Sequence, residues 1–328
     1  MTKFSHLLPA AALAALALLG TASHAAPPLA LAGYTDAAGA ITVLHEGNSA
    51  DPYFAMQALL LAHDNGVDVS VPAAKFADWL APRQKPDGTF DRFCREAGGP
   101  WVSCKAADAD DSLLAMWMRL LETMPAQLQK TPVWLKSHAT SKAALAHLFQ
   151  PSRGVYMVSP LVLHGLFMDN LEVWSLKAQQ KQAGQSGEAG KLAQAIQATF
   201  WNPVDKRFLV STQLEQRSLQ AAFYPHHVAQ IFPLLVDFPL LPEAAGPYYR
   251  KWMTAHRAEW LSQGKADYPW GLLAVLALRQ NDAASARCWL REAAPLRHSA
   301  RWAVTDEVSF QIVTGKGIKP AAPDADCG

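Results

Sequence analysis

The amino-acid sequence predicts an all-α fold, and three observations support that prediction. Apolar residues recur at intervals of three and four along most of the chain, which is the period of a helix with one buried face. Sustained alternation of apolar and polar residues, the pattern of a half-buried strand, is nearly missing from the sequence. Polar helix starts and proline-turn joints recur at spacings of tens of residues, which is typical of a repeated helical unit.

The expected helices fall into two sets that alternate along the chain. Helices of the first set begin with a polar or aromatic cluster, at 46–49, 108–112, 169–174, 223–227, 267–270 and 302–307. Helices of the second set are amphipathic with charged faces, near 73–82, 132–149, 188–201, 247–263 and 282–293. Inner and outer helices in such alternation predict an (α/α)6 barrel, a toroid of six helical hairpins. An open superhelix of helix pairs is the alternative, but clusters that always sit at inner-helix starts favour a closed ring.

The joints between helices share one design. Each has a proline turn followed by an aromatic or β-branched residue, at 86–90, 151–156 and 203–208. Proline ends a helix because it lacks a backbone N–H and fixes φ. No long linker divides the chain, so we expect one domain at 41–318, after a flexible lead at 26–40 and before a tail at 319–328.

The first residues predict an exported protein. Lys3 precedes an apolar run at 7–19, and the small residues Ser23 and Ala25 suit a signal-peptidase site. We expect residues 1–25 to be a signal peptide cleaved after Ala25, and the mature protein to be periplasmic or secreted. No later apolar run in the sequence reaches the roughly 20 residues of a membrane-spanning helix, so no stable membrane anchor is expected.

Charge and cysteine content narrow the partners. The chain has 29 basic and 28 acidic residues, and this balance lacks the basic excess that binding to a phosphate backbone requires. Nucleic acid is therefore not an expected partner. Of the three pairings that four cysteines allow, we expect Cys94 with Cys104, closing a Gly-Gly-Pro-Trp loop, and Cys288 with Cys327, tying down the tail. Because no Cys-x-x-Cys spacing occurs, we expect no metal, and we expect no cofactor.

The candidate site follows from the ring. Inner helices of a closed ring run parallel, so their starts meet at one rim. Asp108, Asp110 and Asp111 open one such helix with more negative charge than a single N-cap needs, although capping plus a solvated turn is the alternative. Carboxylates accept hydrogen bonds from sugar hydroxyls, and aromatic rings stack on sugar rings. The rim therefore predicts a polysaccharide or oligosaccharide as partner.

Two motifs at these helix starts resemble a known family. Glu46-Gly47-Asn48-Ser49, preceded by Thr42-Val43, is similar to the Glu-Gly-Gln-Ser motif of glycoside hydrolase family 8, which includes the endoglucanase that accompanies bacterial cellulose synthesis. Ala107-Asp108-Ala109-Asp110, followed by Trp117 and Leu120-Leu121-Glu122, is similar to the family's Ser-Asp-x-Asp helix start. The resemblance covers residues 41–122 and implies an (α/α)6 barrel, a general acid at Glu46 and a sugar-holding role for Asp108.

The resemblance ends before the family's general base. That base is an Asp directly after a Tyr, whereas Tyr224 is followed here by Pro225-His226-His227. The wider six-hairpin glycosidase superfamily is therefore the closer description. It implies a glycosidase acting on a polysaccharide or exopolysaccharide of the β-glucan type, with exopolysaccharide synthesis or export machinery as a further candidate partner.

Glycosidic hydrolysis by two carboxyl groups sets the expected roles. Glu46 is the expected acid, with N-terminal capping as its alternative role, and Asp110 or Asp169 is its expected carboxylate partner. Crowding of like charges among the three Asp is expected to raise the pKa of at least one of them. The expected sugar-binding residues are Asp108, Asp111, Asn170, Glu172, Trp174, Tyr224, His226, Tyr268, Trp270 and Trp302.

Two other functions remain open from the sequence. A polysaccharide lyase would use Tyr224 with His226 to remove a proton next to a uronate, but the acidic helix starts do not suit an acidic sugar. A barrel that has lost its base would bind a glycan, or act as an accessory of exopolysaccharide export, without cleaving it.

Overall fold

The computed structural model describes residues 26–184, 187–217 and 220–327, and this part of the chain is mostly helical, as predicted. The predicted signal peptide at 1–25 lies outside the described residues. No helix in the described ranges is both long and apolar enough to cross a membrane.

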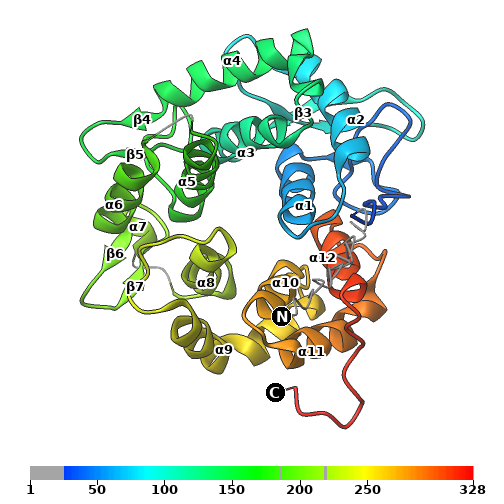
Figure 1. Ribbon diagram of the computed structural model, residues 1–328, viewed down its shortest axis with the longest axis vertical. Coiled ribbons are helices and arrows are strands. Elements are labelled where there is room, and N and C mark those ends of the chain that lie inside the picture. The colour runs from blue at the N-terminus through cyan, green and yellow to red at the C-terminus, as the bar shows by residue number, and fades with distance from the viewer. Residues whose placement is uncertain (1–25, 185–186, 218–219, 328) are drawn as a thin grey trace, which may run out of the picture.

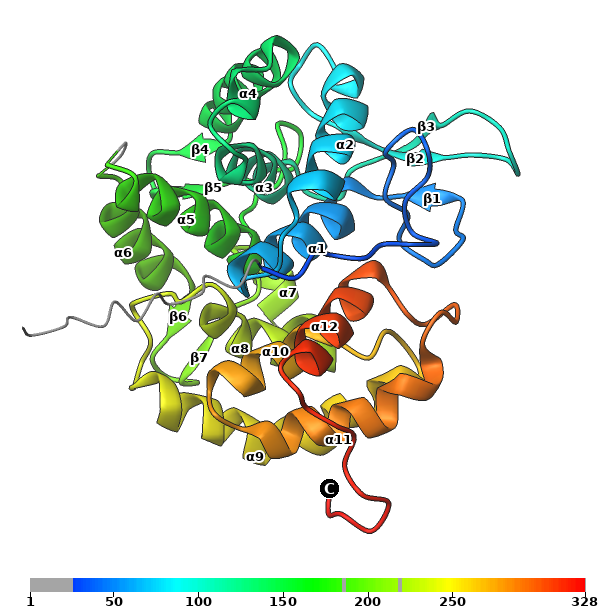
Figure 2. The ribbon, with the colours of Figure 1, turned by 45° about the vertical axis from the view of Figure 1, so that its right-hand side comes forward.

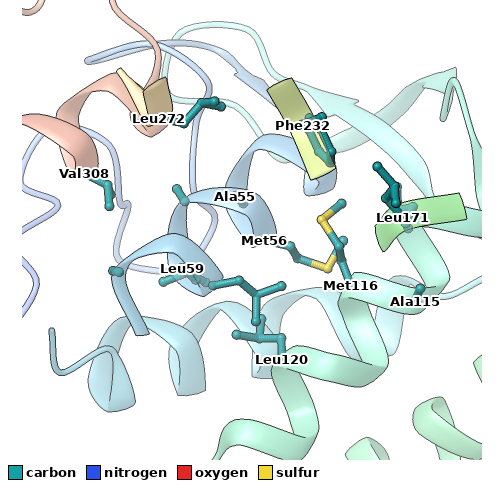
Figure 3. Packing of buried hydrophobic residues seen from close by; sticks show 14 of the residues in the cluster. Ala55, Met56, Leu59, Ala115, Met116, Leu120, Leu171, Phe232, Leu272 and Val308 are labelled. Atoms are coloured by element: carbon teal, nitrogen blue, oxygen red, sulfur yellow. The ribbon is translucent and has the colours of Figure 1, made fainter. Parts of the chain in front are cut away.

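Six helices in the described part of the chain form an inner ring (Figure 1). Each packs against the next, and the last packs against the first, which closes the ring. The inner helices are α1 (Pro52–Asp64), α3 (Asp110–Thr123), α5 (Phe167–Gln182), α8 (Val228–Leu235), α10 (Leu272–Arg279) and α12 (Val304–Gly315). Apolar side chains fill the space where they converge (Figure 3): Ala55, Met56, Leu59, Ala115, Met116, Leu120, Leu171, Phe232, Leu272 and Val308, all buried.

A second set of helices lies outside the ring (Figures 1 and 2). Helix α4 packs on α3, α6 on α5, α9 on α8, and α11 on α10. The outer helices are α2 (Ser70–Leu80), α4 (Pro132–His147), α6 (Ala189–Phe200), α9 (Ala245–Ser262) and α11 (Ala283–Ala293). The short helical pieces are η1 (Ala81–Arg83), η2 (Leu128–Lys130), α7 (Leu214–Arg217), the π-type turn η3 (Phe223–His227), η4 (Gln263–Lys265) and η5 (Ala294–Leu296).

Short antiparallel strands connect some of these helices. Strands β1 (Ser49–Ala50), β2 (Asp91–Cys94) and β3 (Val102–Ala106) form one three-stranded sheet in that order. Two of the proline-turn joints are β-hairpins, which pair β4 (Phe149–Gln150) with β5 (Val155–Tyr156) and β6 (Trp201–Asn202) with β7 (Arg207–Phe208). The first hairpin turns at Gly154, whose φ of +71° favours glycine.

The segment at 26–40, predicted to be a flexible lead, contacts the main core. Leu29, Leu31 and Tyr34 are buried in the main core, and the Leu29 backbone N–H donates to the Asp68 carbonyl at 2.9 Å. Three apolar side chains spaced along a short segment are enough to fix it against the ring, because each removes apolar surface from water.

Both predicted disulfides are confirmed. Cys94 and Cys104 join β2 to β3, and Cys288 and Cys327 tie the C-terminal tail to α11. The paired Cα atoms lie 5.7 Å and 5.6 Å apart, within the usual range for a disulfide. The second bond, together with hydrogen bonds from Arg291 to the carbonyls of Ala322 and Ala325, holds the tail against α11.

Candidate functional site

The starts of two neighbouring inner helices bring three carboxyl groups together. Asp111 lies in the first turn of α3, and Asp169 and Glu172 lie at the start of α5, which packs against α3. Asp169 and Glu172 are three residues apart, so they share one face of the helix. Asp111 is fully buried, Glu172 is 6% exposed, and Asp169 is partly exposed. We call these three residues the carboxyl cluster.

The carboxyl cluster is short of hydrogen-bond partners. Both carboxyl oxygens of Asp111, Oδ2 of Asp169 and Oε2 of Glu172 are buried, and none of these atoms makes a hydrogen bond of good geometry among the described residues. Ser112 is the neighbour whose hydrogen-bonding groups act on the pKa values of Asp111 and Glu172. Buried polar atoms in native proteins are nearly always paired, and exceptions tend to mark functional groups. The cluster is therefore the strongest candidate in the described chain for groups that act on a ligand.

Burial controls the protonation of the cluster. Desolvation, together with the neighbouring charge of Asp108, raises the pKa of Asp169 to about 7. Desolvation and the charge of Asp169 raise the pKa of both Asp111 and Glu172 well above the usual range. The pKa of Asp111 is raised, but by burial and by the charges of Asp169 and Glu172 on α5. Crowding among Asp108, Asp110 and Asp111, the predicted cause, is not among the causes that act on Asp110 or Asp111. At neutral pH the cluster holds protons that it can donate.

A tyrosine from the first inner helix completes the cluster. The Tyr53 hydroxyl donates to Glu172 Oε1 at 2.8 Å, and the Gln57 amide donates to the Tyr53 hydroxyl at 3.2 Å. Asp51, the N-cap of α1, fixes this helix start by accepting from the Tyr53 backbone N–H at 3.0 Å. Sequence reasoning missed Tyr53, and its one available signal was an aromatic residue directly after the Asp51-Pro52 helix start.

Aromatic rings stand beside the cluster. The Tyr224 and Trp270 rings lie 5.4 Å apart at an interplanar angle of 31°, and Trp270 is held at a positive φ of 53°. Partial burial and the charges of Asp169 and Glu172 raise the pKa of Tyr224 to about 12. The Tyr224 side chain is nevertheless 56% exposed, so its ring offers a surface to a ligand. An exposed aromatic ring next to carboxyl groups suits a sugar ring.

Asp108 is an exposed carboxylate close to the cluster. Its side chain is 69% exposed, it pairs with Arg92, and its charge acts on both Asp169 and Tyr224. Arg92 also pairs with Asp51 through Nε and Oδ2 at 2.7 Å. Arg92 on β2 thereby joins the starts of α1 and α3, and its ion pair fixes the exposed carboxylate of Asp108 near the buried carboxyl groups.

Two hollows lie in the described structure close to the inner helices, and neither of them encloses the cluster. Glu172 lines a cavity of about 80 Å³ between the inner helices, with Gln57, Arg119 and apolar side chains. Small-molecule sites usually have about 300–1,000 Å³, so this cavity is too small to hold a sugar ring with its substituents. A groove of about 740 Å³ lies between α4 and α6, and none of the predicted site residues lines it.

The structure places two predicted catalytic residues away from the cluster. Glu46 is exposed in the turn before β1, with a φ of 52°, and its backbone N–H donates to the Gly33 carbonyl at 2.6 Å. Asp110 is next to Asp111 in sequence, but its pKa is raised to about 6 by desolvation among the charges of Lys85, Asp87 and Asp91. Neighbouring residues on a helix point about 100° apart, which separates Asp110 from Asp111.

Four predicted sugar-binding residues have structural roles in this fold. The buried Asn170 amide exchanges hydrogen bonds with the backbone of Tyr156, and it also donates to the Leu166 carbonyl. Trp174 is 7% exposed and packs against Phe238 with ring centroids 5.3 Å apart. Trp302 is fully buried, stacks on Trp289 and donates to Glu307 at 3.2 Å. These contacts correct the expectation that each of these side chains faces the cleft.

His226 is the fourth residue of this group. Its Nδ1 accepts from the Ala222 backbone N–H at 3.3 Å, which closes the η3 turn. Desolvation and the positive charges of Arg207 and His227 lower the pKa of His226, and the carboxyl cluster is not among the charges that act on it.

Tyr268, another predicted sugar-binding residue, is partly exposed, and the centroid of its ring lies 5.9 Å from that of Phe54.

Comparison with known proteins supports the fold. No family model matches the sequence, and no curated protein matches it. Among solved structures, the chain is similar to "a novel alpha-amylase from Clostridium perfringens", with a TM-score of 0.57 and 7% identity over 87% of this chain and 94% of that one. It is also similar to an uncharacterized conserved protein from Thermus thermophilus, with a TM-score of 0.53 and 10% identity over 87% of this chain and 98% of that one. The chain thus shares its overall fold with these two proteins.

Proposed function

We propose that this protein is an exported glycoside hydrolase of the six-hairpin barrel type, acting on a polysaccharide. The observation that carries the proposal is Asp169, a partly exposed carboxyl group with a pKa of about 7, placed between the exposed Asp108 and the buried Asp111 and Glu172. The aromatic pair of Tyr224 and Trp270 beside it supplies a stacking surface. The likeness to an α-amylase supports a glycosidase on the level of fold.

In this proposal Asp169 takes the role of general acid that the sequence assigned to Glu46. Its raised pKa keeps a proton available near neutral pH, and that proton passes to the glycosidic oxygen as the C–O bond breaks. Asp108, held by Arg92, accepts a proton from the water that attacks the sugar carbon. Asp111 and Glu172 are positioning residues, while burial and the charge of Asp108 hold the proton on Asp169.

Two kinds of glucan are the substrates to test first. The motif resemblance at 41–122 favours a β-linked glucan or another exopolysaccharide, while the structural neighbour is named an alpha-amylase, which makes starch the other choice. The expected signal peptide supports a periplasmic or secreted location, where a role beside exopolysaccharide synthesis or export machinery fits the proposal. Release of reducing ends from starch, β-glucans and bacterial exopolysaccharides measures the activity directly.

The decisive variant is Asp169→Asn, which keeps the shape of the side chain but replaces the acidic carboxyl group by an amide that cannot donate a proton as an acid. Loss of a general acid typically lowers the rate by about 10²- to 10⁴-fold, and we expect that loss here. Asp110→Asn is the matched control, since Asp110 also starts α3 but is affected by the charges of Lys85, Asp87 and Asp91. Glu46→Gln tests the role of general acid that the family resemblance implies for Glu46. Full activity in Asp169→Asn, or loss in Glu46→Gln alone, contradicts the assignment.

A glycan-binding function without cleavage is the second candidate. Four buried carboxyl oxygens that make no hydrogen bond of good geometry among the described residues, and the missing Asp after Tyr224, favour it. Affinity gel electrophoresis distinguishes the two functions. Retarded migration without release of reducing ends from any glycan in the panel supports binding alone, and an absorbance band of unsaturated products would instead indicate a lyase.

A further inference from the structure

The outer face of the η3 turn carries a second group of polar side chains, which the proposed function does not use. His227 ends the η3 turn, and His256 and Glu259 lie on the outer helix α9, which packs against that turn. One nitrogen of each histidine and one Glu259 oxygen all lie within 4.8 Å of one another. Within residues 26–184, 187–217 and 220–327, no other group of three His, Cys, Asp or Glu side chains is this compact.

The geometry points to a divalent transition-metal site, and we propose that His227, His256 and Glu259 bind Zn²⁺. His227 Nδ1 lies 2.8 Å and His256 Nδ1 lies 3.5 Å from the same Glu259 oxygen, Oε2. Ligand atoms about 2.1 Å from a tetrahedral zinc ion lie roughly 3.4 Å apart. The three atoms therefore need only small side-chain movements to surround an ion.

The fold prepares this arrangement. His256 and Glu259 are three residues apart, so one face of α9 presents both. The His227 and His256 rings stack with centroids 4.0 Å apart, and the Trp252 indole donates to the His227 carbonyl at 2.8 Å, which fixes the turn against the helix. Two imidazoles and one carboxylate form a known zinc ligand set, with a fourth position left for water.

The chemistry of the ligands selects the metal. Imidazole nitrogens suit Zn²⁺, Ni²⁺ and Cu²⁺, whereas Mg²⁺ and Ca²⁺ prefer sites made of oxygen atoms alone. All three side chains are partly exposed, at 23%, 24% and 38%, so an ion can enter from solvent. This inference differs from the sequence-based expectation of no metal, which rested on cysteine spacing.

The site has a structural consequence. The η3 turn that ends at His227 also carries Tyr224, whose ring stands beside the carboxyl cluster. An ion shared by the turn and α9 would tie the two elements together from outside the ring. The zinc ion would then steady the position of Tyr224 without touching a substrate.

Calorimetric titration of chelator-treated protein with ZnCl₂ tests the proposal. We expect one ion per chain in the wild type, and binding at least about tenfold weaker in His256→Ala and in Glu259→Gln, since even outer-sphere partners contribute that much. His138→Ala is the matched control, because His138 pairs with Glu122 at 2.8 Å on another face. MgCl₂ should give no binding heat.

A second measurement keeps the test valid if a variant fails to fold. In the wild type, saturating ZnCl₂ should shift the side-chain NMR signals of His227 and His256 and leave those of His138 unchanged. Zinc affinity in His256→Ala equal to that of the wild type, or equal shifts at all histidines, would overturn the proposal.

Discussion

Two regions of the inner ring carry buried carboxyl groups, the start of α12 and the adjoining starts of α3 and α5, and they differ in how those groups are paired. At the start of α12, Asp306 accepts from the backbone N–H groups of Gly271 at 2.8 Å and Ala303 at 3.1 Å. Glu307 accepts from Arg297 through two bonds of 2.7 Å and 2.8 Å, and from Trp302. The carboxyl cluster at the starts of α3 and α5 is also largely buried, but four of its oxygens make no hydrogen bond of good geometry among the described residues.

The difference separates a structural site from a candidate active site. The α12 carboxylates join α10 to α12 and help to close the ring, so their hydrogen bonds serve the fold. The cluster at α3 and α5 contributes little such bonding, and burial costs it free energy unless the groups are protonated. An arrangement that costs stability and persists in a rim position is what a functional site often shows. Three predictions test this contrast, from the largest expected effect to the smallest.

Removing Glu307 should have the largest effect on stability. Glu307 is 3% exposed, and breaking a buried ion pair typically costs about 3–5 kcal/mol. Because Arg297 can reach solvent, we expect Glu307→Ala to lower the free energy of unfolding by roughly 3 kcal/mol in urea denaturation. Glu46→Ala, an exposed glutamate, is the control and should stay within about 0.5 kcal/mol of the wild type. Equal changes in the free energy of unfolding in the two variants would contradict the structural role of Glu307 at the start of α12.

Asp111→Asn should have a smaller effect that depends on pH. The pKa of Asp111 is raised in the folded protein, so between about pH 4 and its folded pKa the folded chain binds a proton that the unfolded chain has lost. Stability from this group is therefore greatest at low pH and falls as pH rises. We expect urea midpoints of the wild type and Asp111→Asn to be closer at pH 4.5 than at pH 7.5, where the variant should gain relative to the wild type. A constant difference between the two proteins at all pH values would contradict the assigned protonation.

Tyr53→Phe should have the smallest effect on stability and a visible effect on the site. The substitution removes one hydroxyl bond to Glu172, which is typically worth about 1 kcal/mol. Because a hydrogen-bond donor to the carboxylate is lost, the pKa values of the cluster should rise further, and the pH profile of glycan cleavage should shift upward. Tyr249→Phe, which removes a bond to Asp282 on the outer helices, is the control and should leave the profile unchanged.

Sequence patterns predicted the parts of the molecule that depend on local physics. The period of apolar residues located the inner and outer helices, because one buried face is needed wherever a helix packs on a ring. The expected outer helix at 132–149 is observed at Pro132–His147, and the one at 282–293 at Ala283–Ala293. The disulfide partners followed from loop lengths, and both pairs are present.

The residues of the candidate site were predicted in part. Asp108, Asp111, Asp169, Glu172 and Tyr224 belong to one group of side chains whose charges act on one another. Glu46 was placed by a motif resemblance, but its exposed turn keeps it out of the cluster. Trp302 could not be separated from a stacking residue, since a tryptophan in the core and one at a cleft look the same in a sequence.

The sequence by itself determined a mostly helical chain, the order of its inner and outer helices, its cross-links and the acidic character of its helix starts. These properties depend on residues close together, through helix periodicity, proline and charge. Only the tertiary structure decided which carboxyl groups lose their partners. The residues Tyr53 and Glu172 are 119 positions apart in the sequence. They come into contact because α1 packs against α3 and α3 packs against α5 in the ring.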